Sequence, residues 1–222
     1  MMRKLILLIT ILLLQSAMAA GQDGNLECRT NRTAPPTGFP AWPSDAQVKV
    51  YFVRGMFTAD QKQALLRAMD LWSEAAKRKG AGVTFTYAGE SDRIDSCKSC
   101  LTVTRREVRK SDRKHYSFFN GWRLESDNLI QWAWIDFDIA TTEPKALQGF
   151  MAHELGHGMG LEDCISCKKK QTIMSAFPGI NRDNGLIEPS ACDLEVVRQV
   201  YELQRRVASN TASNTGRETK HD

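Results

Sequence analysis

The chain has 222 residues, which is long enough for one domain with further segments at its ends. Hydrophobic residues make up 42% and charged residues 25%, which excludes a collagen, a wholly disordered chain and a protein with many membrane spans. The 30 Lys and Arg against 26 Asp and Glu give a formal charge of +4. Without the first two basic residues, Arg3 and Lys4, the balance is +2 (28 minus 26), so we expect no nucleic-acid partner.

The first 19 residues have the organisation of an export signal. Arg3 and Lys4 form a basic start, residues 5–14 are largely apolar, and Ala-Met-Ala at 17–19 supplies a site for signal cleavage. The apolar run is about half the ~20 residues that a membrane-spanning helix needs. We therefore predict a signal peptide over 1–19, a secreted protein (extracellular or periplasmic) and no stable membrane anchor.

Composition divides the rest of the chain into three parts. Residues 20–43 are polar and rich in Pro, Gly and Thr, which predicts an extended lead-in or a short pro-segment. Residues 44–206 carry the periodic apolar patterns and form the predicted domain. Residues 207–222 are polar and lack periodicity, so we expect a disordered tail.

Apolar residues that alternate with polar ones predict the strands of a sheet. The expected strands cover 47–53, 83–87, 101–108, 115–123 and 129–139. After the first strand, Thr58 and Gln61 have the spacing of a capping box, which marks the start of a helix that ends near Gly80.

Two more helices are expected in the second half of the chain. One runs from about residue 142 to Gly158, with Pro144 in the first turn, where its missing N–H costs nothing. Ser190 and Asp193 form a second capping box, which predicts the start of a last helix.

Six cysteines are present, namely Cys28, Cys97, Cys100, Cys164, Cys167 and Cys192. An even number in an exported chain favours disulfides. Four of them form two CxxC pairs, so a structural zinc held by thiolates and a dithiol redox motif are the alternatives.

Residues 153–157, His-Glu-Leu-Gly-His, form the HExxH arrangement within the second predicted helix. Positions i and i+4 share one face of a helix, so both imidazoles reach one ion, and Glu154 lies close enough to contact a water there. The flanking residues are apolar, and unpaired histidines buried among them would be costly. Of the two other histidines, His115 is interpreted as structural or surface, and His221 lies in the tail.

The residues after this motif contain a candidate for a third ligand. Gly160 permits the left-handed conformation that ends a helix and turns the chain back, which directs Asp163 toward the two histidines. Two imidazoles and a carboxylate leave one position for water, the open geometry of a catalytic zinc site. Cys164 and Glu162 compete with Asp163 for this role, and Glu195 is the alternative if the third ligand comes from a later helix.

The segment from His153 to Asp163, followed by Met174 in a predicted tight turn, resembles the metzincin metallopeptidases. Their pattern is HExxHxxGxxH/D with a Met-turn. The capped first helix and the last helix are similar to matrixin-type catalytic domains over roughly residues 45–205, and the Asp in third position is similar to snapalysin-like enzymes. The resemblance implies an α+β fold, with a mixed twisted sheet, a backing helix and an active-site helix. It also implies a small C-terminal subdomain with the Met-turn and the final helix.

The implied activity is zinc-dependent hydrolysis of peptide bonds inside proteins or peptides. His153, His157 and Asp163 are the expected ligands, Glu154 the general base, and Met174 a packing residue beneath the metal. An inactive secreted binding protein on the same scaffold and an enzyme that cleaves non-peptide amides are the alternatives.

Further candidates surround the expected site. Ala176, Phe177 and Pro178 are candidates for an apolar wall of the substrate pocket. Asp136 and Asp138 alternate along a predicted strand, where they bind a structural calcium or form a solvated face.

Two further predictions concern the lead-in and an edge strand of the sheet. Asp23 and Cys28 are candidates for a latch on the zinc, with a disulfide as the alternative for Cys28. An extended substrate is expected to pair with an edge strand from the 115–139 region.

Overall fold

A computed structural model of the chain describes residues 40–107, 117–124, 129–164, 167, 172–175 and 186–218. Of these, 117–124 and 211–218 are described by their backbone alone. Some of the sequence-based predictions lie outside the described residues, namely those on 1–39 (with Asp23 and Cys28), His115, Ala176, Phe177, Pro178 and His221.

Five strands form one mixed sheet in the order β2-β1-β3-β5-β4. They are β1 (Gln47–Val53), β2 (Thr84–Ser91), β3 (Cys100–Arg106), β4 (Ser117–Leu124) and β5 (Ile130–Asp138). Neighbouring strands are parallel except at the β4 edge, where β4 pairs antiparallel with β5. All five predicted strands are present with somewhat shifted ends, which confirms the mixed sheet.

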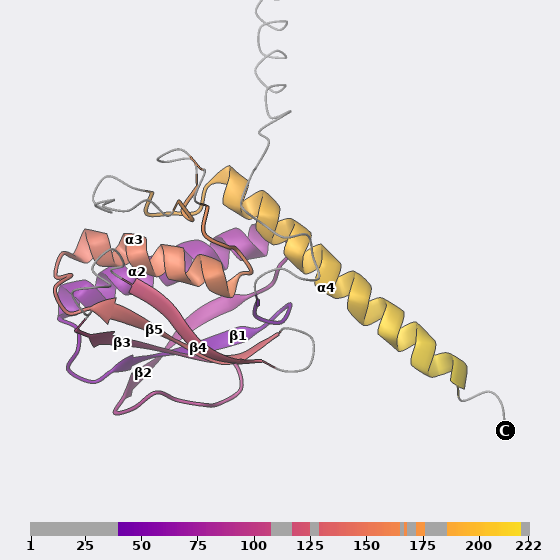
Figure 1. The fold of residues 1–222 in the computed structure, drawn as a ribbon, viewed down its shortest axis with the longest axis horizontal. Helices are drawn as coiled ribbons and strands as arrows, with labels where there is room; N and C mark the ends of the chain where they lie inside the picture. The colour runs from indigo at the N-terminus through magenta and orange to yellow at the C-terminus, as the bar shows by residue number, and fades with distance from the viewer. Residues whose placement is uncertain are drawn as a thin grey trace, which may run out of the picture.

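Two helices, α2 (Ala59–Arg78) and α3 (Pro144–Gly158), lie over the same face of the sheet (Figure 1). At the start of α2, the backbone N–H of Gln61 donates to the Thr58 hydroxyl, and the N–H of Thr58 donates to the Gln61 side chain. The predicted capping box is thereby confirmed. Pro144 lies in the first turn of α3, as expected.

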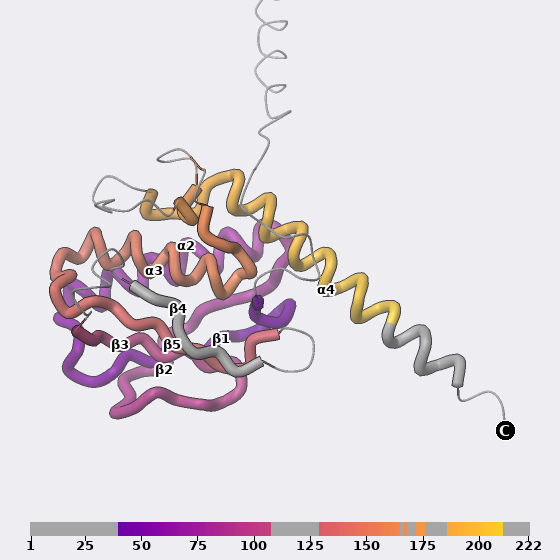
Figure 2. The backbone as a smooth tube through the Cα atoms, in the orientation of Figure 1, coloured from indigo at the N-terminus to yellow at the C-terminus, as the bar shows by residue number. Residues whose placement is uncertain are grey.

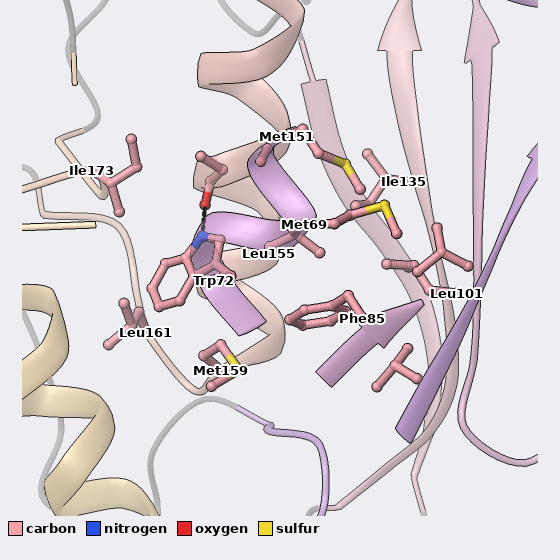
Figure 3. Close-up of a cluster of buried hydrophobic side chains, with 14 of the residues drawn as sticks. Met69, Trp72, Phe85, Leu101, Ile135, Met151, Leu155, Met159, Leu161 and Ile173 are labelled. Atoms are coloured by element: carbon pink, nitrogen blue, oxygen red, sulfur yellow. Dashed lines mark hydrogen bonds between the residues drawn. The ribbon is translucent and has the colours of Figure 1, made fainter. Parts of the chain in front are cut away.

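The core lies between this pair of helices and the sheet (Figure 3). The indole N–H of Trp72, a buried residue of α2, donates to the backbone carbonyl of Ala152 in α3 at 2.6 Å. Ala152 immediately precedes the first histidine of the motif. The two helices are therefore joined by a directional bond immediately before the HExxH motif of α3.

The last helix, α4 (Ala191–Glu218), begins at the predicted capping box of Ser190 and Asp193, whose side chains each accept the backbone N–H of the other residue. Its first part packs into the core through Val197 and Tyr201, and its second part extends away from the body (Figures 1 and 2).

Here the structure differs from the expectation of a disordered tail from residue 207, because α4 continues to Glu218. Residues 205–210 are exposed. Packing of the first turns provides the costly helix nucleus, and each later residue then adds a hydrogen bond without a new nucleation step. Within the described residues, no helix is both long enough and apolar enough to cross a bilayer.

Candidate metal site

The two motif histidines project from the C-terminal half of α3, and both are largely buried. Their rings are nearly perpendicular, at 86°, with centroids 4.9 Å apart. Oδ1 of Asp163 lies 3.2 Å from Nε2 of His153 and 3.8 Å from Nε2 of His157. Among the described residues these three side chains form the one cluster with metal-ligand geometry, each offering one ligand atom within 4.8 Å of the others.

The outer ring nitrogens of the two histidines are held by backbone carbonyls. Nδ1 of His153 lies 2.9 Å from the carbonyl oxygen of Ile173, and Nδ1 of His157 lies 2.8 Å from that of Leu161. A carbonyl only accepts, so each Nδ1 is the donor, and in the neutral form of each ring the lone pair is on Nε2. Both lone pairs therefore belong to the nitrogens nearest Asp163.

Two physical tests agree that this donor set fits a metal ion. Ligands about 2.1 Å from a tetrahedral ion lie about 3.4 Å from each other, which is close to the two separations from Asp163. The pKa of His157 is lowered mainly by burial and secondly by electrostatic repulsion from the neighbouring His153. A lowered pKa favours the neutral form of the imidazole, which is the form that binds metals.

A sharp turn after α3 brings Asp163 to the histidines. Gly160 has a φ of +85°, and a β-carbon there would lie 3.1 Å from Val200 and 3.3 Å from Ala41. Glycine therefore meets both a conformational and a spatial requirement. The N–H of Leu161 then donates back to the carbonyl of Gly156 at 3.0 Å, which completes the reversal predicted from the sequence.

A second tight turn, residues 172–175, supports the site from the other side. Its Ile173 carbonyl faces His153, and its Met174 carbonyl accepts the N–H of Cys164, the residue after the third ligand, at 2.7 Å. Met174 itself is fully buried, as a packing residue should be. A β-carbon on Gly156 would lie 2.4 Å from Met174 Sδ, so Met174 packs directly on α3.

The turn is fixed to α4 by a single buried carboxylate. Asp193 accepts from the hydroxyl of Thr172 and from the N–H of Ile173 at 2.9 Å. It also accepts from the N–H and the hydroxyl of Ser190, at 2.8 and 2.7 Å. The sequence predicted only the capping role of Asp193, because nothing local marks its contact with the turn.

Glu154 follows the first histidine on α3 and is 2% exposed. The sequence motif predicts that a carboxylate at this position exchanges protons with a water at the site. The structure thus brings together the side chains of His153, His157 and Asp163, and Glu154 adjoins His153 in α3. The candidate pocket residues lie outside the described part of the chain.

The competing third ligands have other positions. Cys164 forms a disulfide with Cys167 and offers no thiolate. Glu195, on α4, accepts from Arg198 at 2.6 and 3.0 Å, and this bond lowers its pKa to about 2. Neither Glu195 nor Glu162 belongs to the ligand cluster.

The cysteines form disulfides, as predicted, and not a zinc site of thiolates. Each CxxC pair is bonded within itself, Cys97 to Cys100 and Cys164 to Cys167. Cys192 is also disulfide-bonded. Both CxxC pairs are thus oxidised and supply no metal ligands.

The acidic residues considered for calcium are paired with the protein's own groups. Oδ2 of Asp136 lies 3.1 Å from Nε of Arg106, and Oδ1 of Asp138 accepts the N–H of Ala140 at 3.0 Å. The guanidinium of Arg105 donates to nearby backbone carbonyls, including those of Asp138 at 3.3 Å and of Ile139 and Thr141 at 2.7 Å. A cationic side chain therefore already occupies the oxygen-rich end of β5.

The chain matches no protein-family model and no curated protein by sequence. Solved structures do resemble it. The crystal structure of metalloproteinase-II from Bacteroides fragilis is 13% identical over 77% of this chain, with a TM-score of 0.46. The structure of myroilysin is 13% identical over 73% of this chain, with a TM-score of 0.42. The chain spans 58% of the length of the first and 82% of the second.

At these identities and TM-scores the likeness carries no argument about what this chain does. The mixed sheet, with α2 and α3 over one face, matches the α+β arrangement that is expected from the sequence. The argument for a function rests on the chain's own side chains at the candidate metal site.

Proposed function

We propose that the chain is a secreted, zinc-dependent endopeptidase. The observation that carries this proposal is the convergence of Asp163 with His153 and His157, which lie in a helix that also holds the motif acid Glu154. The sequence motif requires only a shared helix face, whereas the structure adds a third donor from outside the helix. The export signal at the start of the sequence supports secretion.

The donor set suits zinc and leaves it an open side. Two neutral imidazoles and one carboxylate are a ligand set of catalytic zinc sites, and the Asp163 side chain is 47% exposed, so solvent reaches the cluster. When bound, zinc polarises a carbonyl and makes water more acidic. The chain's own groups hold the imidazoles in the ligand tautomer through the carbonyls of Ile173 and Leu161.

Glu154 is the group that moves the proton. Its carboxylate accepts a proton from the attacking water and returns it to the nitrogen of the leaving amine. Burial, at 2% exposure, keeps this carboxylate away from bulk water. An inactive binding protein would not need an acidic residue at this position.

The substrate is proposed to be an extended polypeptide. β4 is an edge of the sheet and antiparallel to β5, and a peptide can add to it as a further strand. This edge strand falls within the region expected from the sequence. Ala176, Phe177 and Pro178 are proposed as the apolar wall beside the scissile bond.

Hydrolysis of casein by the purified mature chain, with and without a zinc chelator, tests the proposal. We expect cleavage at internal bonds that the chelator stops and added zinc restores. Glu154→Gln should retain zinc and lose turnover by orders of magnitude, because the amide cannot accept the proton. Zinc binding without casein cleavage would favour the binding-protein alternative. Cleavage of small amides alone would favour the third alternative.

A further inference from the structure

Asp163 is the one proposed ligand that lies outside the helix α3. The regular helix α3 holds both histidines, whereas Asp163 lies beyond the end of α3 at Gly158, in irregular chain, with a side chain 47% exposed. Helix geometry therefore does not fix the position of its carboxylate. The next anchor along the chain is the residue that follows it, Cys164.

Cys164 is held by two bonds of different kinds. Its N–H donates to the carbonyl of Met174 at 2.7 Å, and its side chain is bonded to Cys167. Both cysteines are buried, with exposures of 0% and 4%. The backbone beside the third ligand is thus tied to the supporting turn and also closed by a covalent crosslink.

The anchor at Cys164 matters because a metal site tolerates only small displacements of its ligands. The α-carbons of adjacent residues are about 3.8 Å apart, so a fixed Cys164 restricts where Asp163 can lie. Metal sites require ligand distances within about 0.2 Å of their ideal values. Removal of the crosslink takes away one of the bonds that restrain Cys164, the neighbour of Asp163, whose Oδ1 lies 3.2 Å from Nε2 of His153.

We propose that the Cys164–Cys167 disulfide is a positioning element of the metal site, which holds Asp163 as third ligand. The inference rests on the proposed function, because it concerns the affinity of that same site. It assigns this crosslink a role in metal binding beyond the general stabilisation that a disulfide gives a secreted protein.

The chain contains a matched control for this proposal. Cys97 and Cys100 form a disulfide with the same spacing. Cys100 and Thr102 alternate along β3 with Leu101 and Val103, which pack in the core beneath the helices. The control disulfide therefore lies at the opposite face of the sheet and touches no proposed ligand.

The test compares zinc dissociation constants, measured by competition with a chromophoric chelator, in the mature chain and its variants. Cys164→Ala/Cys167→Ala should bind zinc about 10–100-fold more weakly, the usual cost of removing outer support from a metal ligand. Cys97→Ala/Cys100→Ala should bind like the wild type. Equal affinities of the two double variants would overturn the proposal. Absence of zinc binding by the wild type would instead refute the proposed function itself.

A double-mutant cycle separates positioning from general stability. If the disulfide acts through Asp163, its removal should cause no further loss of affinity in the Asp163→Ala background. An additive loss would show that the crosslink supports the whole fold and would overturn the proposal. If the alanine variant does not fold by circular dichroism, Cys164→Val/Cys167→Ala preserves more of the buried volume. Failure of both to fold would also assign the disulfide a general structural role.

Discussion

The carboxylate of Asp193 accepts the backbone N–H of Ile173 at 2.9 Å, and the carbonyl of the same Ile173 faces Nδ1 of His153, also at 2.9 Å. One peptide segment thus connects a buried acid at the start of α4 to a proposed metal ligand on α3. The residues involved are 20 positions apart on each side, so the connection exists only in the folded chain. It makes Asp193 a positioning residue for the site.

Asp193→Asn should therefore weaken zinc binding. The amide can accept fewer of the four hydrogen bonds that Asp193 now receives and brings two donors that need partners. We expect zinc affinity to fall about 10–100-fold while the far-ultraviolet circular dichroism stays that of the wild type. Asp70→Asn, an exposed carboxylate on α2, is the control. Unchanged zinc affinity in Asp193→Asn would show that the turn keeps its position without this acid.

The same acid illustrates what sequence can and cannot predict here. The capping boxes and the HExxH motif depend on residues within about one helical turn, so their spacing alone predicts them. The support of His153 by Ile173 comes from a backbone carbonyl, which every residue possesses and no pattern marks. The second role of Asp193 depends on how the 172–175 turn lies against α4.

Other features of the structure differ in how far the sequence predicts them. The bond from the Trp72 indole to the carbonyl of Ala152 requires α2 and α3 to meet in one register, which the sequence of neither helix specifies. α4 extends to Glu218 because a helix that is already packed at its start can propagate. Hydrophobic periodicity cannot predict this extension, since the exposed part of the helix has no apolar face. Asp163 was predicted because Gly160 signals a chain reversal and the family pattern supplies the position.

Asp163→Ala should remove most of the zinc affinity, because the two remaining imidazoles form an incomplete ligand set. Glu162→Ala is the matched control, since it deletes the adjacent carboxylate, which lies outside the cluster. Isothermal titration with zinc should show strong binding in the control and weak binding in Asp163→Ala. The reverse order would make Glu162 the third ligand.

Calcium should leave the thermal stability of the protein unchanged. Arg105 already donates to the carbonyls of Asp138, Ile139 and Thr141, and Arg106 pairs with Asp136. Melting curves of metal-free protein with and without calcium chloride test this expectation. A rise in melting temperature on calcium addition would show that a calcium site forms despite the two arginines.

The converse experiment removes the guanidinium. Arg105→Met should lower the free energy of unfolding by about 1–3 kcal/mol, since carbonyls at the end of β5 lose their donor. Arg93→Met, an exposed arginine, is the control. Equal stability of the two variants would mean that water replaces the guanidinium at no cost.

Glu195 should make a pH-dependent contribution to stability. Its bond to Arg198, and next that to Gln199, lower its pKa in the folded chain to about 2, from 4.5 in the absence of these partners. A depressed carboxylate pKa stabilises the fold above the unfolded value, and that contribution disappears as the pH falls from about 4.5 toward 2. The difference in melting temperature between wild type and Glu195→Gln should therefore shrink over this range. A difference that stays constant would contradict the assignment, and Glu188→Gln, which changes an exposed acid, is the control.

Gly156→Ala tests the packing beneath the proposed site. Alanine is about 1 kcal/mol better than glycine inside a helix, so helix propensity alone predicts a more stable protein. The new β-carbon would, however, lie 2.4 Å from Sδ of Met174 and 3.4 Å from Cζ2 of Trp72. Both side chains are fully buried and have little room to move, and overpacking of this kind typically costs about 1–3 kcal/mol.

We therefore expect Gly156→Ala to be less stable than wild type in urea denaturation, despite its higher helix propensity. Displacement of Met174 should also disturb the turn whose carbonyls support His153 and Cys164, and so reduce zinc affinity. Gly156→Ala/Met174→Ala restores the space by removing the thioether. It should recover part of the zinc affinity, although the shortened side chain leaves a cavity. A Gly156→Ala protein that is more stable than wild type, with the same zinc affinity, would show that Met174 can move aside without affecting the site.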